Sequence, residues 1–237
     1  MTKALLTATI AAALLTGAVA NAAPGRQAGG AAHGLAGRAA PVPPLTWGVA
    51  DDAAKFADDG GEWFYGMMRE AGLSENRWTL AFDPSRPTEI AELPFLEHAA
   101  PLAEDAGIRV VLALYTGDPA PLARVHPAGA FCAWAGLVAQ TAAQWGIHDY
   151  IVGNEPNTAL YWAPQKNRRG KDVAAAPYER LLARCYDIIH AADPEANVIG
   201  MGLSPRASRP KTSNEPLAFL RDVGPSTASR GGAGSGR

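Results

Sequence analysis

Three times along the chain, a stretch with apolar side chains at helical spacing leads to a glycine, and a short apolar run follows. The helical stretches are 63–71, 95–106 and 131–145, the glycines are Gly72, Gly107 and Gly146, and the apolar runs are 77–82, 108–114 and 150–152. A glycine just past a helix adopts the left-handed conformation that other residues resist, so each is predicted to end its helix and return the chain to a sheet. Successive glycines lie about 35 to 39 residues apart, the length of one strand-plus-helix unit.

Further segments extend this alternation at both ends. Apolar runs at 45–49 and 197–203 predict a first and a fifth strand, and residues 177–192 and 216–223 have helical spacing. Strands that alternate with helices predict an α/β fold with a parallel sheet and right-handed crossovers. A doubly wound sheet and a (β/α)8 barrel both satisfy this order. No Gly-x-Gly-x-x-Gly or Walker-type loop follows any predicted strand, which argues against a nucleotide-binding sheet.

The run from Ile151 to Asn157 contains the first candidate for chemistry. Pro156 cannot continue a strand, so Asn154 and Glu155 are predicted to lie at the carboxyl end of the fourth strand, where parallel α/β folds place their active sites. A carboxylate there can act as a general acid, and a neighbouring amide can bind a substrate hydroxyl. Alternatively, Glu155 is a loop carboxylate that caps the next turn.

The same tripeptide occurs again as Asn214-Glu215-Pro216, in a different setting. Polar residues 208–213 precede it and a helical pattern follows it. Here Asn214 is predicted to be an N-cap, with Glu215 and Pro216 in the first turn of a helix. The second copy is therefore expected to be structural.

A larger set of motifs carries a resemblance to a known superfamily. The set is Val152 to Asn157 with Tyr161 to Gln165, Asn76-Arg77-Trp78, Phe82-Asp83-Pro84, and Ala191 to Pro194. Together they resemble the clan A glycoside hydrolases, which include the cellulase family, over roughly residues 45–223. The resemblance implies a (β/α)8 TIM barrel that hydrolyses O-glycosidic bonds, mainly β-linked, with retention of configuration and without a metal or organic cofactor.

The resemblance also implies roles for individual residues. Glu155 corresponds to the general acid/base, Asn154 to the amide that contacts the sugar 2-hydroxyl, and Arg77 to the arginine that supports the catalytic carboxylates. Trp162 is a candidate for stacking on a pyranose ring, and equally a core aromatic. Asn157, inside the motif, is a further substrate-binding candidate. The expected partner is an oligo- or polysaccharide.

One half of the expected chemistry has no counterpart in this sequence. A retaining glycosidase needs two carboxylates about 5 to 5.5 Å apart, and in clan A the nucleophile follows strand seven. After Val223 the sequence is a low-complexity tail, residues 224–237. We therefore expect an incomplete barrel of about five of eight βα units, truncated at its carboxyl end, with impaired or no activity as written. The alternative is a non-catalytic carbohydrate-binding or interaction protein derived from such a barrel.

Composition and the amino-terminal sequence indicate the number of domains, the class of partner and the export of the protein. The chain has 237 residues and a net charge of −2, which fits one globular domain and gives no reason to expect nucleic acid. Residues 1–22 have the pattern of a cleaved secretory signal, and residues 23–44 are predicted to be a flexible Gly/Ala/Pro leader before the barrel domain at 45–223. We expect a secreted protein without a stable membrane anchor, because the apolar run is short for a spanning helix.

Two cysteines, Cys132 and Cys185, fall within predicted helices. An exported protein can join such a pair in a disulfide, but geometry cannot be tested from sequence. Two buried free thiols are the favoured expectation.

Overall fold

The computed structural model describes residues 45–117, 125–207, 209 and 211–224. The predicted signal segment, the leader and all but the first residue of the low-complexity tail lie outside the described residues and stay predictions. Within the described part of the chain, no helix has both the length and the apolar character needed to cross a bilayer.

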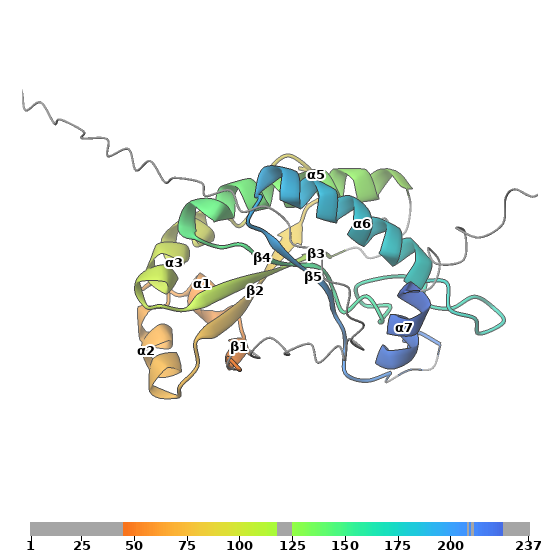
Figure 1. Cartoon of the computed structure of the whole chain (residues 1–237), viewed down its shortest axis with the longest axis horizontal. Helices are drawn as coiled ribbons and strands as arrows, with labels where there is room; N and C mark the ends of the chain where they lie inside the picture. Colours follow the sequence, from red (N-terminus) through yellow and green to blue (C-terminus); the bar gives the residue numbers. More distant parts are fainter. Residues whose placement is uncertain (1–44, 118–124, 208, 210, 225–237) are drawn as a thin grey trace, which may run out of the picture. The chain divides into compact units, whose positions relative to one another are not determined.

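Five parallel strands form one sheet in the order of the sequence, β1-β2-β3-β4-β5 (Figure 1). The strands are β1 (Gly48–Ala50), β2 (Glu75–Phe82), β3 (Arg109–Thr116), β4 (Asp149–Asn154) and β5 (Asn197–Gly202). A doubly wound sheet reverses its strand order at a switch point, whereas a barrel adds each strand beside the last. The uninterrupted order therefore selects the barrel alternative, and the described fold is part of an α/β barrel.

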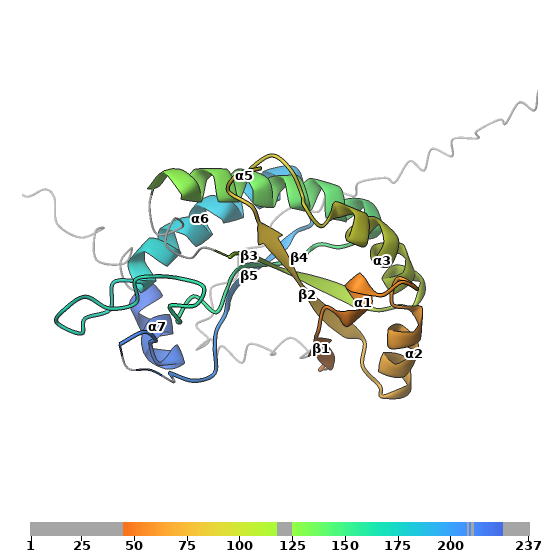
Figure 2. The same cartoon turned by 180° about the vertical axis from the view of Figure 1, so that it is seen from behind.

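Helices follow the strands as the sequence predicts. They are α1 (Ala53–Phe56), α2 (Glu62–Glu70), α3 (Leu93–Asp105), α5 (Val125–Ala142), the 3-10 turn η1 (Ala143–Trp145), α6 (Ala175–Ala192) and α7 (Pro216–Val223). Figures 1 and 2 show α3, α5 and α6 on the same side of the sheet. The three predicted turn glycines all have positive φ, between 65° and 74°. The four-residue α1 was not expected, because it is too short to give a periodic signal.

The main core lies between the sheet and these helices. Alternate residues of β2, namely Trp78, Leu80 and Phe82, are buried there against the helices. Val111, Ala113 and Ile151 instead form a smaller cluster with Ile199 on the opposite, inner face of the sheet. Burial on both faces is what a barrel wall requires. It explains why β3 and β4, which are buried on both faces, are nearly continuous apolar runs.

The first residue of four successive strands joins a polar layer on the inner face. The Arg109 guanidinium donates to Asp149 at 2.7 Å and to Glu75 at 2.9 Å, and Asn197 Nδ2 donates to Asp149 at 2.7 Å. The Asp149 carboxylate raises the pKa of Arg109. This layer lies at the amino ends of the strands, the face of a barrel that serves stability.

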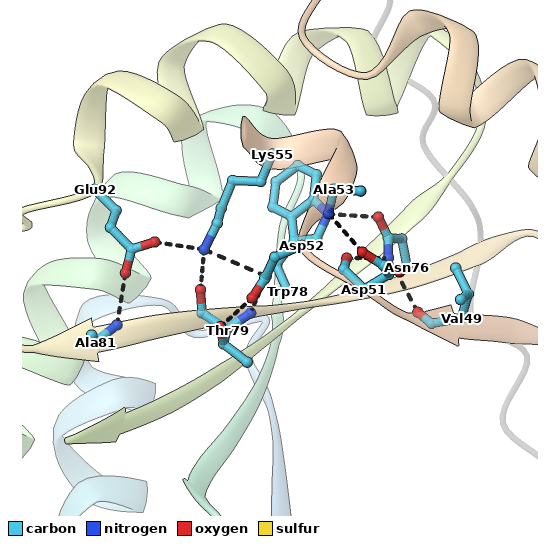
Figure 3. Close-up of polar contacts among 10 residues, drawn as sticks. All are labelled: Val49, Asp51, Asp52, Ala53, Lys55, Asn76, Trp78, Thr79, Ala81 and Glu92. Atoms are coloured by element: carbon cyan, nitrogen blue, oxygen red, sulfur yellow. Dashed lines mark hydrogen bonds and ion pairs between the residues drawn. The ribbon is translucent and has the colours of Figure 1, made fainter. Parts of the chain in front are cut away.

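A second polar cluster completes the edge of β2 beyond the short β1 (Figure 3). The backbone N–H of Thr79 donates to the Asp52 carboxylate at 2.8 Å, and that of Ala81 donates to Glu92 at 2.9 Å. Lys55, whose side chain is fully buried, donates to Glu92 at 2.6 Å and to the carbonyl of Thr79. Two carboxylates thus replace the backbone acceptors that a longer first strand would supply, and the Lys55 ammonium pairs with both and offsets part of their charge.

A disulfide joins Cys132 on α5 to Cys185 on α6, which corrects the expectation of two free thiols. Their Cα atoms are 4.6 Å apart and both residues are fully buried. The two helices approach closely because α5 carries Gly136, where a Cβ would lie 2.7 Å from Ile188 Cγ2. The sequence separation of 53 residues gives no hint of this packing.

Candidate active site

The alternation of side chains along β4 changes at Gly153. Val152 belongs to the helix-facing core, and a Cβ on Gly153 would also point to the helices, 3.2 Å from Tyr178 Cε2. Gly153 has φ 78°, so the left-handed backbone places two successive residues on the same side. Asn154 is consequently turned to the inner face, toward β2.

Asn154 and Arg77 meet on that inner face, although β3 separates their strands. The Arg77 guanidinium donates to Asn154 Oδ1, and Asn154 is 8% exposed. Among the described residues, no partner accepts from Arg77 Nε, which is buried. The pairing brings together two of the residues selected from sequence, and it orients the amide so that Asn154 Nδ2 is left to donate.

Glu155 follows β4 directly and is half-buried. Its backbone N–H donates to Gly202 O at 2.9 Å, and its carbonyl accepts from Thr158 N at 2.9 Å. Its φ of 42° lies in the left-handed region, which is costly for a residue with a Cβ. The hydrogen bonds on both sides hold this strained backbone conformation. The conformation determines the direction in which the Glu155 side chain leaves the backbone.

An aromatic pair lies near the same strand ends. Tyr115, near the end of β3, packs edge-to-face on Tyr161 with ring centroids 5.8 Å apart. Burial raises the pKa of Tyr115, with smaller contributions from the charges of Glu92 and Asp52. The sequence interpretation missed Tyr115, whose only signal was its place at the end of an apolar run.

Trp162 and Asn157 do not present their side chains to a ligand in this structure. Trp162 is 2% exposed, donates from Nε1 to Ala174 O at 3.0 Å, and packs on Tyr178. Of the two alternatives for Trp162, the structure shows the core aromatic, because the loop after β4 folds back onto α6. Asn157 is fully buried, so its expected substrate contact is also replaced by a structural role.

That role is to clamp the loop after β4 to the loop after β5. Asn157 Nδ2 donates to Ser204 O at 3.0 Å and to Asn214 O at 3.1 Å, and Asn157 Oδ1 accepts from Ser204 N at 2.8 Å. Asn214 Nδ2 in turn donates to Gln165 Oε1 at 2.9 Å. Both Asn-Glu-Pro segments therefore belong to one scaffold. The N-cap of α7 is Glu215, one residue later than expected.

A pocket of about 550 Å³ opens beside Glu155, between these two loops. Its lining is Glu155, Thr158, Ala159, Leu160, Ser204, Arg206, Arg209, Thr212 and Ser213. Within this described lining Glu155 is the sole carboxylate, and two guanidinium groups accompany it. The arginines were not selected from sequence, because nothing in a polar stretch indicates which loop it will pack against.

Known structures show the same type of fold. A family 39 glycoside hydrolase from the gut symbiont Bacteroides cellulosilyticus WH2 superposes with a TM-score of 0.52 at 19% identity, over 67% of this chain and 32% of that one. A β-glucosidase from Thermotoga maritima, solved with cyclophellitol, gives a TM-score of 0.49 at 14% identity, over 65% of this chain and 48% of that one. This chain thus spans less than half the length of either neighbour.

No protein-family model matches the sequence, and no curated protein sequence does. The likeness to the family 39 enzyme therefore concerns the fold. It agrees with the strand order in identifying the described residues as part of a (β/α)8 barrel.

Proposed function

We propose that this chain, part of a glycosidase-type barrel, acts on β-linked O-glycosidic bonds with Glu155 as the proton donor and later the base of a retaining reaction. The observation that carries the proposal is the position of Glu155 at the carboxyl end of β4, in a pocket and next in sequence to the amide that Arg77 orients. Barrel enzymes assemble their chemistry at this end of the strands.

The roles follow from the groups present. Glu155 protonates the glycosidic oxygen as the bond to the anomeric carbon breaks, and then removes a proton from the water that releases the sugar. Asn154 Nδ2 donates to a sugar hydroxyl, because Arg77 already occupies Oδ1. Arg77 acts through Asn154 and is a positioning residue.

The covalent step of a retaining reaction also requires a carboxylate nucleophile about 5 to 5.5 Å from the acid. In the described lining of the pocket, no second carboxylate accompanies Glu155. We therefore expect slow turnover by the chain as written. An added small carboxylate, such as formate, can serve as an external nucleophile.

The experiment compares leaving groups in the presence of formate. Paired phenyl and 2,4-dinitrophenyl β-glycosides, as glucosides, xylosides and glucuronides, are tested with the wild type, Glu155→Gln and Glu215→Gln. Phenol release needs protonation, so Glu155→Gln should lower it by about 100-fold or more, while dinitrophenol release, which needs little protonation, should change far less. Glu215→Gln is the matched control, because it alters the same tripeptide outside the pocket lining, and it should leave both rates unchanged.

The comparison of the two leaving groups shows whether Glu155 acts as a proton donor. Equal losses of both rates in Glu155→Gln would exclude a proton-donor role. A wild-type rate on phenyl glycosides that Glu155→Gln leaves unchanged would also exclude it.

A carbohydrate-binding protein without turnover is the second candidate. The observation that favours it is the single carboxylate in the described pocket lining. Saturable binding of a glycoside, with no release of either leaving group even in formate, would support this candidate over hydrolysis.

A further inference from the structure

We infer that the pocket beside Glu155 takes a sugar that carries an anionic group, held between Arg206 and Arg209. This inference deepens the proposed function and rests on it for the identification of the ligand as a sugar. The whole chain has a net charge of −2, yet the pocket contributes two guanidinium groups against one carboxylate. The lining is thus locally cationic.

The backbone that carries Arg209 is fixed to the Glu155 loop. Ser213 Oγ accepts from Arg209 N at 3.1 Å and donates to Arg209 O at 2.7 Å, which closes a tight turn. Ala159 N donates to Thr212 O at 2.7 Å, and Thr158 forms a bridge with Ser213. The backbone of Arg209 is therefore tied to the loop that begins with Glu155.

The backbone just before Arg206 is anchored to the same segment at a second place. It lies two residues after Ser204, whose backbone N–H and carbonyl both bind the Asn157 side chain. Asn157 lies two residues after Glu155. Both arginines thus emerge from backbone that lies near anchors to the segment that carries the carboxylate, so both side chains start from beside Glu155.

The positive charges of Arg206 and Arg209 are available to bind an anion. In the described part of the chain, no ion pair engages Arg206 or Arg209. Arg206 and Arg209 are exposed and line the same pocket, and two cationic side chains in one pocket favour the binding of an anion. Arginine binds carboxylate and sulfate through paired N–H donors, so a sugar with either group fits this wall. Thr158, Ser204 and Thr212 supply hydroxyls for the neutral positions of the ring.

The test measures binding with ligands that cannot be hydrolysed. Phenyl 1-thio-β-glucoside, its glucuronide and its 6-sulfate are titrated into the full chain by calorimetry at low and high salt. Either anionic ligand should bind at least about tenfold more tightly than the glucoside, and this advantage should shrink as salt rises. The glucuronide and sulfate arms distinguish a carboxylate from a sulfate as the preferred group.

Arginine variants then test whether Arg206 and Arg209 cause the preference for anionic ligands. Arg206→Gln/Arg209→Gln should bring all three affinities together, whereas the control Arg221→Gln, on the exposed face of α7, should retain the preference. Thermal melts show whether each variant is folded. Equal affinities in the wild type, no binding of any ligand, or a preference that survives loss of both arginines would overturn the inference. Because these thioglycosides report binding alone, a failure of Glu155 as proton donor leaves this result standing, and the reverse also holds.

Discussion

Gly153 and Met201 occupy neighbouring positions on adjacent strands, and both have left-handed backbone, with φ 78° and 77°. The register pairs Val152 with Gly200 and Asn154 with Gly202, so the two residues lie opposite each other. On β5, as on β4, the change of side follows: a Cβ on Gly200 would face Leu182 of α6, and one on Gly202 would face Ile151 on the inner face. The left-handed residues at these paired positions turn the last side chain of each strand to the inner face. Asn154 therefore faces β2, and the turn at Glu155 follows directly.

Gly153→Ala should therefore destabilise the protein. The left-handed conformation costs a residue with a Cβ about 1–2 kcal/mol, and the new Cβ would lie 3.2 Å from Tyr178 Cε2. We expect the free energy of unfolding in urea to fall by about 2 kcal/mol. Gly66→Ala is the control: it lies within α2 with open space around its Cβ, and should stabilise by about 0.5–1 kcal/mol. Equal stability of the two variants would contradict the role assigned to Gly153.

Asn157→Ala should loosen the two loops together. The change leaves the N–H and carbonyl of Ser204 and the carbonyl of Asn214 without their side-chain partner in a buried place, a cost of about 2–3 kcal/mol. Hydrogen exchange at the Ser204 amide should accelerate accordingly. Asn167→Ala provides the comparison, because Asn167 is exposed and caps only a local turn. Unchanged exchange at Ser204 would show that the clamp contributes little.

The disulfide between Cys132 and Cys185 should contribute strongly to stability. A bridge across 53 residues removes denatured-chain entropy worth roughly 4 kcal/mol in the chain-entropy model. Cys132→Ala/Cys185→Ala should lower the urea midpoint of the oxidised protein. A reducing agent should lower the midpoint of the wild type by a similar amount and leave the double variant unaffected. If reduction shifted both proteins equally, its effect would lie elsewhere than the disulfide.

Alkaline pH should destabilise the fold through buried tyrosines. Burial raises the pKa of Tyr178, whose hydroxyl donates to Val152 O at 2.6 Å. A raised pKa in the folded state gives stability that is complete below the unfolded value of about 10 and is lost as pH rises above it, by at most about 1.4 kcal/mol per pH unit.

Tyr178→Phe isolates this contribution. The variant should be less stable at neutral pH, because it lacks the hydrogen bond, but its free energy of unfolding should fall less steeply above pH 10. Tyr186→Phe, at an exposed position, should follow the wild-type slope. Parallel slopes for all three proteins between about pH 9 and 11 would refute the assignment.

Periodicity and glycine placement predicted most of the fold. The five strands and most of the helices that follow them lie close to their expected positions, because the central strands β3 and β4 are buried on both faces and each long helix buries one side. The choice between a doubly wound sheet and a barrel could not be made from sequence, since the order of strands within a sheet depends on contacts between distant segments. The disulfide was not predicted, because it too depends on a contact between distant segments.

The sequence predicted that Asn154 and Glu155 lie at the carboxyl end of β4, as the structure shows, but it gave no indication of how the neighbouring loops pack. Glu155, Asn154 and Arg77 follow from their places on β4 and β2, and their chemical roles stay predictions. The two alternatives for Trp162 could not be separated from sequence, because an aromatic in a loop is equally suited to a ligand and to a core. Arg206 and Arg209 lie about 50 residues after Glu155 in the sequence, and the contacts that bring their loop beside it, including the Asn157 hydrogen bonds, join residues far apart in the chain.

The carboxylates of Asp52 and Glu92, which accept from β2 beyond the end of β1, have a consequence for how this molecule meets others. A strand edge with open N–H groups is a template on which an extended segment of another chain can add itself. Along this part of β2 the N–H groups of Thr79 and Ala81 are already occupied, and the acceptors belong to charged side chains linked through Lys55. An invading segment would have to displace an ion network before forming its first hydrogen bond, so this stretch of the sheet is protected against aggregation by strand addition.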